Sequence, residues 1–198
     1  ATPIYNHPQI TMEALDAGMH VFCEKAMSNT VEEAKAMVMK SRAVGKNLQI
    51  GHQRMFDKKY LRALEMVKSG DFGPITHIRA NWNLNSSWQK SEIPAEYEKK
   101  LNWRMYAEQC HGLMSELTCH INQVANWFLG QTPKFVSGTG SINYWKDGRT
   151  TYDNVHVMYH YPDGTNFTFN SILSNWHYGL EEQIMGPKNT FELESGKI

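Results

Sequence analysis

Residues 20–51 read HVFCEKAMSNTVEEAKAMVMKSRAVGKNLQIG, in which two short apolar segments flank a helical pattern. The first apolar segment spans residues 20–23 and the second spans residues 47–51. Between them, residues 29–33 (NTVEE) form a capping box that opens a helix, and Gly45 ends it. Because neighbouring parallel strands need a crossover helix, this order predicts an α/β unit with a doubly wound parallel sheet.

The pattern changes outside this unit. Upstream, residues 8–18 predict a short helix, and downstream, residues 57–70 predict another. Residues 111–130 carry the clearest helical stripe, with apolar side chains at steps of four, four, three and four. Alternating strand-like segments occupy residues 75–84, 134–144, 155–161, 166–173 and 180–184. These segments predict a second, largely antiparallel sheet.

Composition limits the classes of partner. Twenty Lys plus Arg balance twenty Asp plus Glu in the 198 residues, so no basic field is present to collect nucleic acid. No stretch approaches the roughly 18 to 20 consecutive apolar residues that a membrane span needs, and no leader opens the chain. Three cysteines without CxxC spacing argue against a disulfide framework or a zinc knuckle. We therefore expect a cytoplasmic protein with a small-molecule partner, and no nucleic acid or membrane partner.

Two motifs carry candidate chemistry. In HVFCEKA, the strand delivers Glu24 and Lys25 to the carboxyl edge of a parallel sheet, where ligands bind in open α/β folds. In residues 112–130 (GLMSELTCHINQVANWFLG), Glu116 and His120 are four residues apart, so an α-helix would place them side by side. A carboxylate in that position can orient a histidine for proton transfer. The alternatives are an ordinary Glu-Lys pair at a strand end and a surface i,i+4 pair.

These motifs resemble the glucose-fructose oxidoreductase / inositol dehydrogenase (Gfo/Idh/MocA) family. AGMHVFCEKA is similar to the family's AGKHVxxEKP segment, with Ala26 in place of Pro, and is preceded by an ATPxxxH loop and followed by GHQR. The second motif is similar to the family's GGxxxDxGxHxxDxxxWLxG helix, with Glu116 in place of Asp and Thr118 in place of Gly. The first residue is Ala rather than Met and the chain stops just after an apolar strand, so we expect a fragment.

The resemblance implies a fold of class α/β + α+β. Residues 1–55 correspond to the C-terminal part of a dinucleotide-binding domain, a partial Rossmann-like parallel sheet. Residues 56–198 correspond to a substrate and oligomerisation domain with an open-faced, mainly antiparallel sheet, which we expect to be truncated. The usual glycine-rich strand-to-helix turn does not occur here, because Gly138-Thr139-Gly140 lies among predicted strands.

The resemblance also implies roles for particular residues. The family's catalytic positions correspond to Lys25, His120 and Glu116. Its substrate contacts correspond to Lys25, Arg104, Glu116 and His120. Its cofactor contacts, to NAD or NADP, correspond to Thr2, Pro3, Asn6, His7, Glu24, Lys25, Gln53, Trp103 and Arg104. For Trp103 and Arg104 the alternative is a core tryptophan covered by an arginine.

The implied activity is hydride transfer between NAD or NADP and a hydroxyl carbon of a sugar, cyclitol or glycoside. His120 would handle the hydroxyl proton, and Lys25 would polarise the oxygen. Two alternatives stay open: an NAD-dependent, redox-assisted glycoside hydrolase, and a non-catalytic sugar-binding or oligomerisation module. We expect a homo-oligomer formed through the second sheet, and no metal, because the histidines lack ligand spacing.

Overall fold

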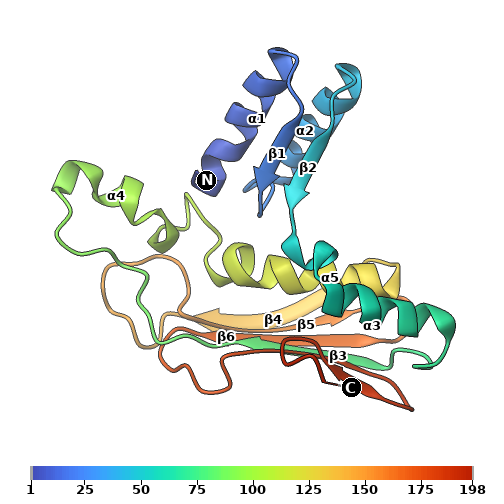
Figure 1. Cartoon of the computed structure of the whole chain (residues 1–198). Helices are drawn as coiled ribbons and strands as arrows, with labels where there is room; N and C mark the ends of the chain where they lie inside the picture. Colours follow the sequence, from blue (N-terminus) through green and yellow to red (C-terminus); the bar gives the residue numbers. More distant parts are fainter. Residues whose placement is uncertain (1, 198) are drawn as a thin grey trace.

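Two sheets of different size make up the chain, as the computed structural model in Figure 1 shows. The structure describes residues 2–197. Ala1, the first residue of the ATPxxxH loop, and Ile198 lie outside the described residues.

The smaller sheet pairs β1 (Val21–Glu24) with β2 (Leu48–Gly51) in parallel. A short 3-10 turn (Ile4–Asn6) and α1 (His7–Asp16) precede β1, and α2 (Val31–Ala43) makes the crossover. The Thr30 hydroxyl oxygen accepts a 3.2 Å hydrogen bond from the Glu33 amide, which satisfies a free amide at the start of α2. The parallel unit expected from the capping box is therefore confirmed.

The larger sheet has six strands in the order β4-β5-β6-β3-β7-β8. Its strands are β3 (His77–Trp82), β4 (Phe135–Ser141), β5 (Asn154–His160), β6 (Asn166–Ile172), β7 (Leu180–Met185) and β8 (Thr190–Glu192). Only β3 and β6 run parallel, and the other neighbours are antiparallel. The expected fold class, a short parallel sheet followed by a mainly antiparallel one, is confirmed.

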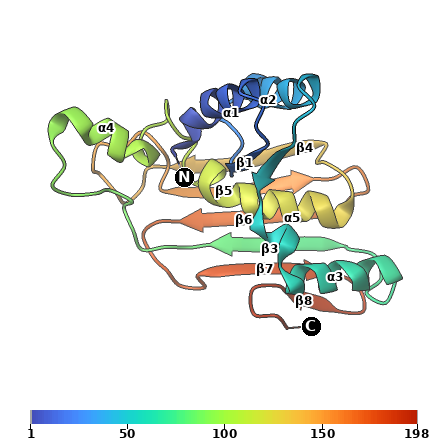
Figure 2. The same ribbon diagram turned by 45° about the horizontal axis from the view of Figure 1, so that its top comes forward.

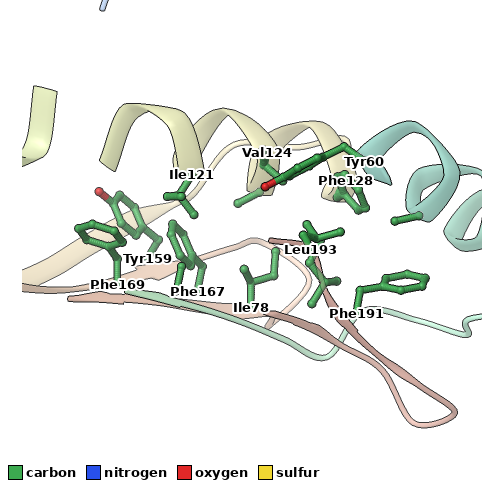
Figure 3. Packing of buried hydrophobic residues seen from close by; sticks show 14 of the residues in the cluster. Tyr60, Ile78, Ile121, Val124, Phe128, Tyr159, Phe167, Phe169, Phe191 and Leu193 are labelled. Carbon is green, nitrogen blue, oxygen red and sulfur yellow. The ribbon is translucent and has the colours of Figure 1, made fainter. Parts of the chain in front are cut away.

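Helices cover one face of the larger sheet. Figure 2 shows α3 (Lys58–Ser69) and α5 (Cys119–Leu129) lying across the same side of it. Short helical turns fill the connections: Gln53–Phe56, Ala95–Tyr97, α4 (Glu98–Leu101) and Trp103–Met105. In Figure 3, Ile121, Val124 and Phe128 of α5 point toward the sheet, and all three are buried. Burial of each such side chain stabilises the fold by about 1.5–3 kcal/mol.

The helix expected over residues 111–130 is not uniform. Residues Met114–Thr118 form a π-helical segment before α5 begins. The Thr118 hydroxyl donates a 3.2 Å hydrogen bond to the carbonyl oxygen of Leu113, five residues earlier, as suits the wider turn. A π turn changes the angular spacing of side chains, so Glu116 and His120 do not share a face as an ideal α-helix would place them.

Polar contacts fasten the small sheet to the rest of the chain. The Asn29 side-chain amide donates a 2.8 Å hydrogen bond to the Gln109 carbonyl oxygen, and His111 Nε2 lies 2.8 Å from the Asn29 carbonyl oxygen. Ile4 packs against Trp103 and Cys110 in a separate apolar cluster. These contacts hold the carboxyl ends of β1 and β2 close to the start of α5 (Figure 1).

Across residues 2–197, no helix has both the length and the apolar character that crossing a membrane requires.

Candidate active site

A cavity of about 460 Å³ opens at the carboxyl ends of β1 and β2, beside α5. Four lining residues belong to the two parallel strands, four to the segments that follow these strands, and one to α5. The lining residues are Phe22, Glu24, Lys25, Gln49, Gly51, His52, Gln53, Phe56 and His120. Of the residues expected at the site, Glu24, Lys25, Gln53 and His120 are therefore brought together.

Lys25 and Arg104 share one buried carboxylate. Lys25 Nζ lies 3.5 Å from Glu116 Oε1 and donates a 3.0 Å hydrogen bond to the Glu116 backbone carbonyl oxygen. Arg104 Nε donates a 2.5 Å hydrogen bond to Glu116 Oε2. The Glu116 side chain is only 6% exposed, so these two cations compensate a charge that water does not reach. Glu116 thus holds both cationic side chains in place.

The guanidinium group of Arg104 packs on the ring of Trp103. The Arg104 guanidinium carbon lies 4.3 Å from the centroid of the Trp103 ring, a cation-π contact, while Tyr5 packs edge-on against the same ring at 6.5 Å. Trp103 itself is buried. The structure therefore agrees with a core tryptophan covered by an arginine, and a contact between Trp103 and a cofactor stays a prediction.

The His120 side chain packs against aromatic rings and not against the carboxylate of Glu116. Its ring centroid is 5.5 Å from that of Trp82 and 6.4 Å from that of His52, and Nδ1 is buried with no hydrogen-bond partner among the described residues. Our expectation that Glu116 orients His120 is wrong. The π-helical segment turns the carboxylate toward Lys25 and Arg104 instead.

Burial is the main cause that lowers the pKa of His120 to about 3, and the positive charges of Lys25 and Arg54 contribute to the same shift. Burial also lowers the pKa of His52, again with help from Lys25. Both imidazoles are therefore neutral at pH 7. A neutral ring can accept a proton, which a permanently charged ring cannot.

The N-terminal loop contacts the turn that contains Lys25 and Ala26. His7 is buried, with Nδ1 2.8 Å from the Ala26 carbonyl oxygen and Nε2 3.0 Å from the Thr2 carbonyl oxygen. The Lys25-Ala26 peptide bond is cis. Both ring nitrogens of His7 are thus engaged with the backbone of the loop, and a contact of His7 with a cofactor stays a prediction.

The remaining loop residues divide between two positions. Thr2 and Glu24 line a neighbouring hollow of about 310 Å³ on the other side of β1. Pro3 and Asn6, both described, line neither this hollow nor the main cavity. Contacts of these loop residues with a cofactor stay predictions.

A buried ion cluster behind the cavity was not expected from the sequence. Arg54 Nε lies 3.1 Å from Glu182 Oε2, Arg54 Nη2 lies 2.7 Å from Glu194 Oε1, and the Tyr60 hydroxyl donates to Glu182 Oε2 at 2.6 Å. Burial raises the pKa of Glu182 to about 7, against the opposing effect of Arg54. The Arg54 guanidinium also lies 5.4 Å from the Trp82 ring, on which His120 rests. No local pattern marks this cluster, because 128 residues separate Arg54 from Glu182.

His52 was also outside the expected set, although it directly precedes Gln53. Its position after β2 was the available signal, since each parallel strand directs its following residues to the same edge. Among residues 2–197, no group of three or more His, Cys, Asp or Glu side chains is arranged to hold a metal ion. The cavity combines the Lys25 ammonium with the neutral imidazoles of His52 and His120 and the carboxyl side chain of Glu24.

Comparison with protein families identifies both parts of the chain. Residues 60–192 match the model described as "GFO/IDH/MocA C-terminal domain". Residues 1–52 match the model described as "Oxidoreductase family, NAD-binding Rossmann fold".

Among curated proteins, an uncharacterised oxidoreductase of Schizosaccharomyces pombe is 26% identical over 190 residues, covering 93% of this chain and 49% of that protein. The scyllo-inositol 2-dehydrogenase (NAD(+)) of Bacillus subtilis is 26% identical over 141 residues, covering 71% of this chain and 37% of that protein. A glycosyl hydrolase family 109 protein of Shewanella baltica is 31% identical over 106 residues, covering 54% of this chain and 22% of that protein. The chain spans about half the length of the first of these relatives, and less of the others.

Solved structures share the fold. The aldose-aldose oxidoreductase of Caulobacter crescentus superposes with a TM-score of 0.81 at 24% identity, covering 96% of this chain and 53% of that one. An oxidoreductase domain protein of Kribbella flavida superposes with a TM-score of 0.80 at 25% identity, covering 98% of this chain and 54% of that one.

Proposed function

The chain belongs to the GFO/IDH/MocA oxidoreductase family, and from that premise we propose that the protein transfers hydride between NAD or NADP and a hydroxyl-bearing carbon of a sugar, cyclitol or glycoside. The observation that carries this proposal is the meeting of Lys25 and His120 in one cavity at the carboxyl ends of two parallel strands. A cation and a neutral imidazole are the two groups that oxidation of an alcohol requires beside the hydride acceptor.

The residues present fit the nicotinamide end of such a cofactor. The cavity lies at the edge of the parallel sheet where nucleotides bind in open α/β folds, and Glu24 and Gln53 offer polar groups there. When bound, the cofactor supplies the hydride acceptor, and the chain supplies everything else described below.

His120 would take the proton of the substrate hydroxyl on its Nε2. The Lys25 ammonium would donate a hydrogen bond to the same oxygen and stabilise the negative charge that develops there. In the direction of reduction, His120 would return the proton to the carbonyl oxygen. Glu116 would hold Lys25, and would hold Arg104 where it can contact the substrate.

A second candidate is redox-assisted glycoside cleavage, which the 31% identity to a glycosyl hydrolase family 109 protein favours over 106 residues. In this reaction the sugar is oxidised transiently, the neighbouring C-H bond becomes acidic, and elimination breaks the glycosidic bond. The two activities differ in their products, because only the dehydrogenase accumulates reduced cofactor.

In this proposal the two parts of the chain have different roles. Residues 1–55 would serve the cofactor, and residues 56–198 would serve substrate binding and assembly. The face of the larger sheet that α3 and α5 leave open would form the contact between copies in a homo-oligomer. Its edge strand β4 supports this assignment, since Phe135, which stacks on His160 at that face, is exposed by more than half.

The cytoplasm is the compartment that fits this activity. Cys23, Cys110 and Cys119 are all free thiols in the structure. Free thiols persist in reducing compartments, where nicotinamide-dependent metabolism takes place.

The test is a spectroscopic assay on the longest natural form of the protein. It is mixed with NAD or NADP and with sugars, cyclitols and glycosides, and the ultraviolet absorbance of reduced nicotinamide is followed. Turnover that disappears in Lys25→Ala and in His120→Ala supports hydride transfer. Release of an aglycone without accumulated reduced cofactor would favour the glycosidase. Sugar binding without turnover or cofactor binding would leave a binding module.

A further inference from the structure

Two histidines face the same cavity from different parts of the fold. His52 directly follows β2, and His120 lies in the first turn of α5. Their ring centroids are 6.4 Å apart and the ring planes meet at 89°. Both side chains line the cavity that also holds Lys25.

In each of the two rings, one nitrogen is enclosed by protein and the other is open to the cavity. In both rings Nδ1 is enclosed by protein and has no partner in the described part of the chain. Nε2 of each ring is not enclosed, and within residues 2–197 no side chain or carbonyl group is bonded to it. Because both rings line the cavity, Nε2 is the atom that each presents to it. The cavity therefore offers two independent imidazole contacts beside one ammonium.

We propose that His52 binds the hydroxyl group next to the one that reacts at His120, so that the site selects substrates with hydroxyls on adjacent carbons. This inference rests on the proposed function. An imidazole nitrogen holds a hydroxyl oxygen at about 2.8 Å. Two rings whose centroids are 6.4 Å apart and that face one cavity can then meet oxygens on neighbouring carbons. His52 is thus a specificity-determining residue.

Lys25 and His52 differ in charge, and this difference separates their roles at the two substrate oxygens. Lys25 approaches Glu116 and supplies the cation for the reacting oxygen, so His52 is not needed for that purpose. A neutral imidazole can either donate or accept a hydrogen bond, which suits a hydroxyl group that does not change its charge. A simple alcohol would use Lys25 and His120 and leave His52 without a partner, at the cost of one hydrogen bond.

The direct test is nitrogen-15 NMR of the histidine rings during titration with scyllo-inositol, in which every hydroxylated carbon has hydroxylated neighbours. The signals are assigned by comparison with His52→Phe and His120→Phe. Scyllo-inositol is expected to shift the Nε2 signals of both rings, and cyclohexanol is expected to shift His120 alone. A shift of His120 alone with scyllo-inositol overturns the role of His52 and leaves the proposed function standing. No shift at either ring counts against both.

A second measurement uses affinity and turnover. His52→Phe is expected to weaken scyllo-inositol binding about tenfold or more, the effect of one hydrogen bond to a substrate hydroxyl, and to leave cyclohexanol binding unchanged. With NAD as cofactor, His52→Phe is also expected to lower kcat/KM for scyllo-inositol about tenfold or more and to leave kcat/KM for cyclohexanol unchanged. His177→Phe, at an exposed position of the loop between β6 and β7, is the matched control and leaves both affinities unchanged. Equal losses of affinity for both alcohols in His52→Phe would overturn the proposal, since they would show that the substitution changes the shape of the whole cavity.

Discussion

Lys25 Nζ donates a 3.0 Å hydrogen bond to the backbone carbonyl oxygen of Glu116, although 91 residues separate the two in sequence. The carboxylate of the same residue lies 3.5 Å from the ammonium group. Through this pair, the turn that follows β1 is attached to the π-helical segment Met114–Thr118. The lysine is thereby held beside the cavity before any ligand arrives, which reduces the cost of ordering it on binding.

Replacing Lys25 with Met keeps most of the side-chain volume and removes the cation. We expect kcat to fall at least about a hundredfold, because a positioned donor to a developing negative charge contributes that much. Steady-state assays of the longest natural form measure this. Lys35→Met, on the exposed face of α2, is the control and should keep full activity. Comparable activity in the two variants would remove Lys25 from the reaction.

Glu116→Gln and Glu116→Asp separate the charge of this residue from its shape. The glutamine has no negative charge to hold Lys25 and Arg104, so we expect kcat/KM to fall about tenfold or more. The aspartate keeps the charge and should retain more activity than the glutamine. Kinetics of both variants, with melting temperatures to confirm folding, test this. The reverse order of activities would show that shape, and not charge, matters at residue 116.

His120 should make stability depend on pH in acid. Its pKa is about 3 in the folded protein, against 6.5 for an ordinary histidine, so the unfolded chain binds a proton first as pH falls. The unfolding free energy should therefore drop by up to about 1.4 kcal/mol per pH unit between pH 6.5 and about 3 because of this residue. Urea unfolding of the protein and of His120→Asn, from pH 7 to pH 5, isolates the contribution. Parallel curves for the two proteins would contradict the burial argument.

Arg54→Met should expose the dependence of the buried cluster on its cation. The variant leaves the buried Glu182 without its compensating charge, and we expect a loss of about 3–5 kcal/mol in unfolding free energy at pH 8. The loss should be smaller at pH 5, because Glu182 then takes up a proton. Arg79→Met is the matched control: it removes a half-exposed arginine 3.8 Å from Glu181 and should cost less than about 1 kcal/mol. The test compares the urea unfolding midpoints of both variants at both pH values. If Arg54→Met lost the same unfolding free energy at pH 8 and pH 5, the loss would come from packing alone and not from the charge of Glu182.

The sequence alone predicted most of the elements and four of the side chains that line the cavity, Glu24, Lys25, Gln53 and His120. The capping box at Thr30 and Glu33 and the apolar segments on either side of it predicted the parallel pair β1 and β2. The position of Lys25 after a strand predicted its place at the carboxyl edge of the sheet. These inferences succeeded because they depend on contacts between residues that are close in sequence, where periodicity and capping chemistry act directly.

Only the tertiary structure decided the partners. The π-helical segment placed Glu116 between Lys25 and Arg104 instead of beside His120, and the packing of α5 against the loop after β2 brought His52 to His120. These partners come from distant parts of the chain, so their meeting depends on how the two sheets pack and on one wider helical turn. The sequence pattern reports which face of an element is apolar, whereas the direction of a polar side chain depends on the charges that the folded neighbours place around it.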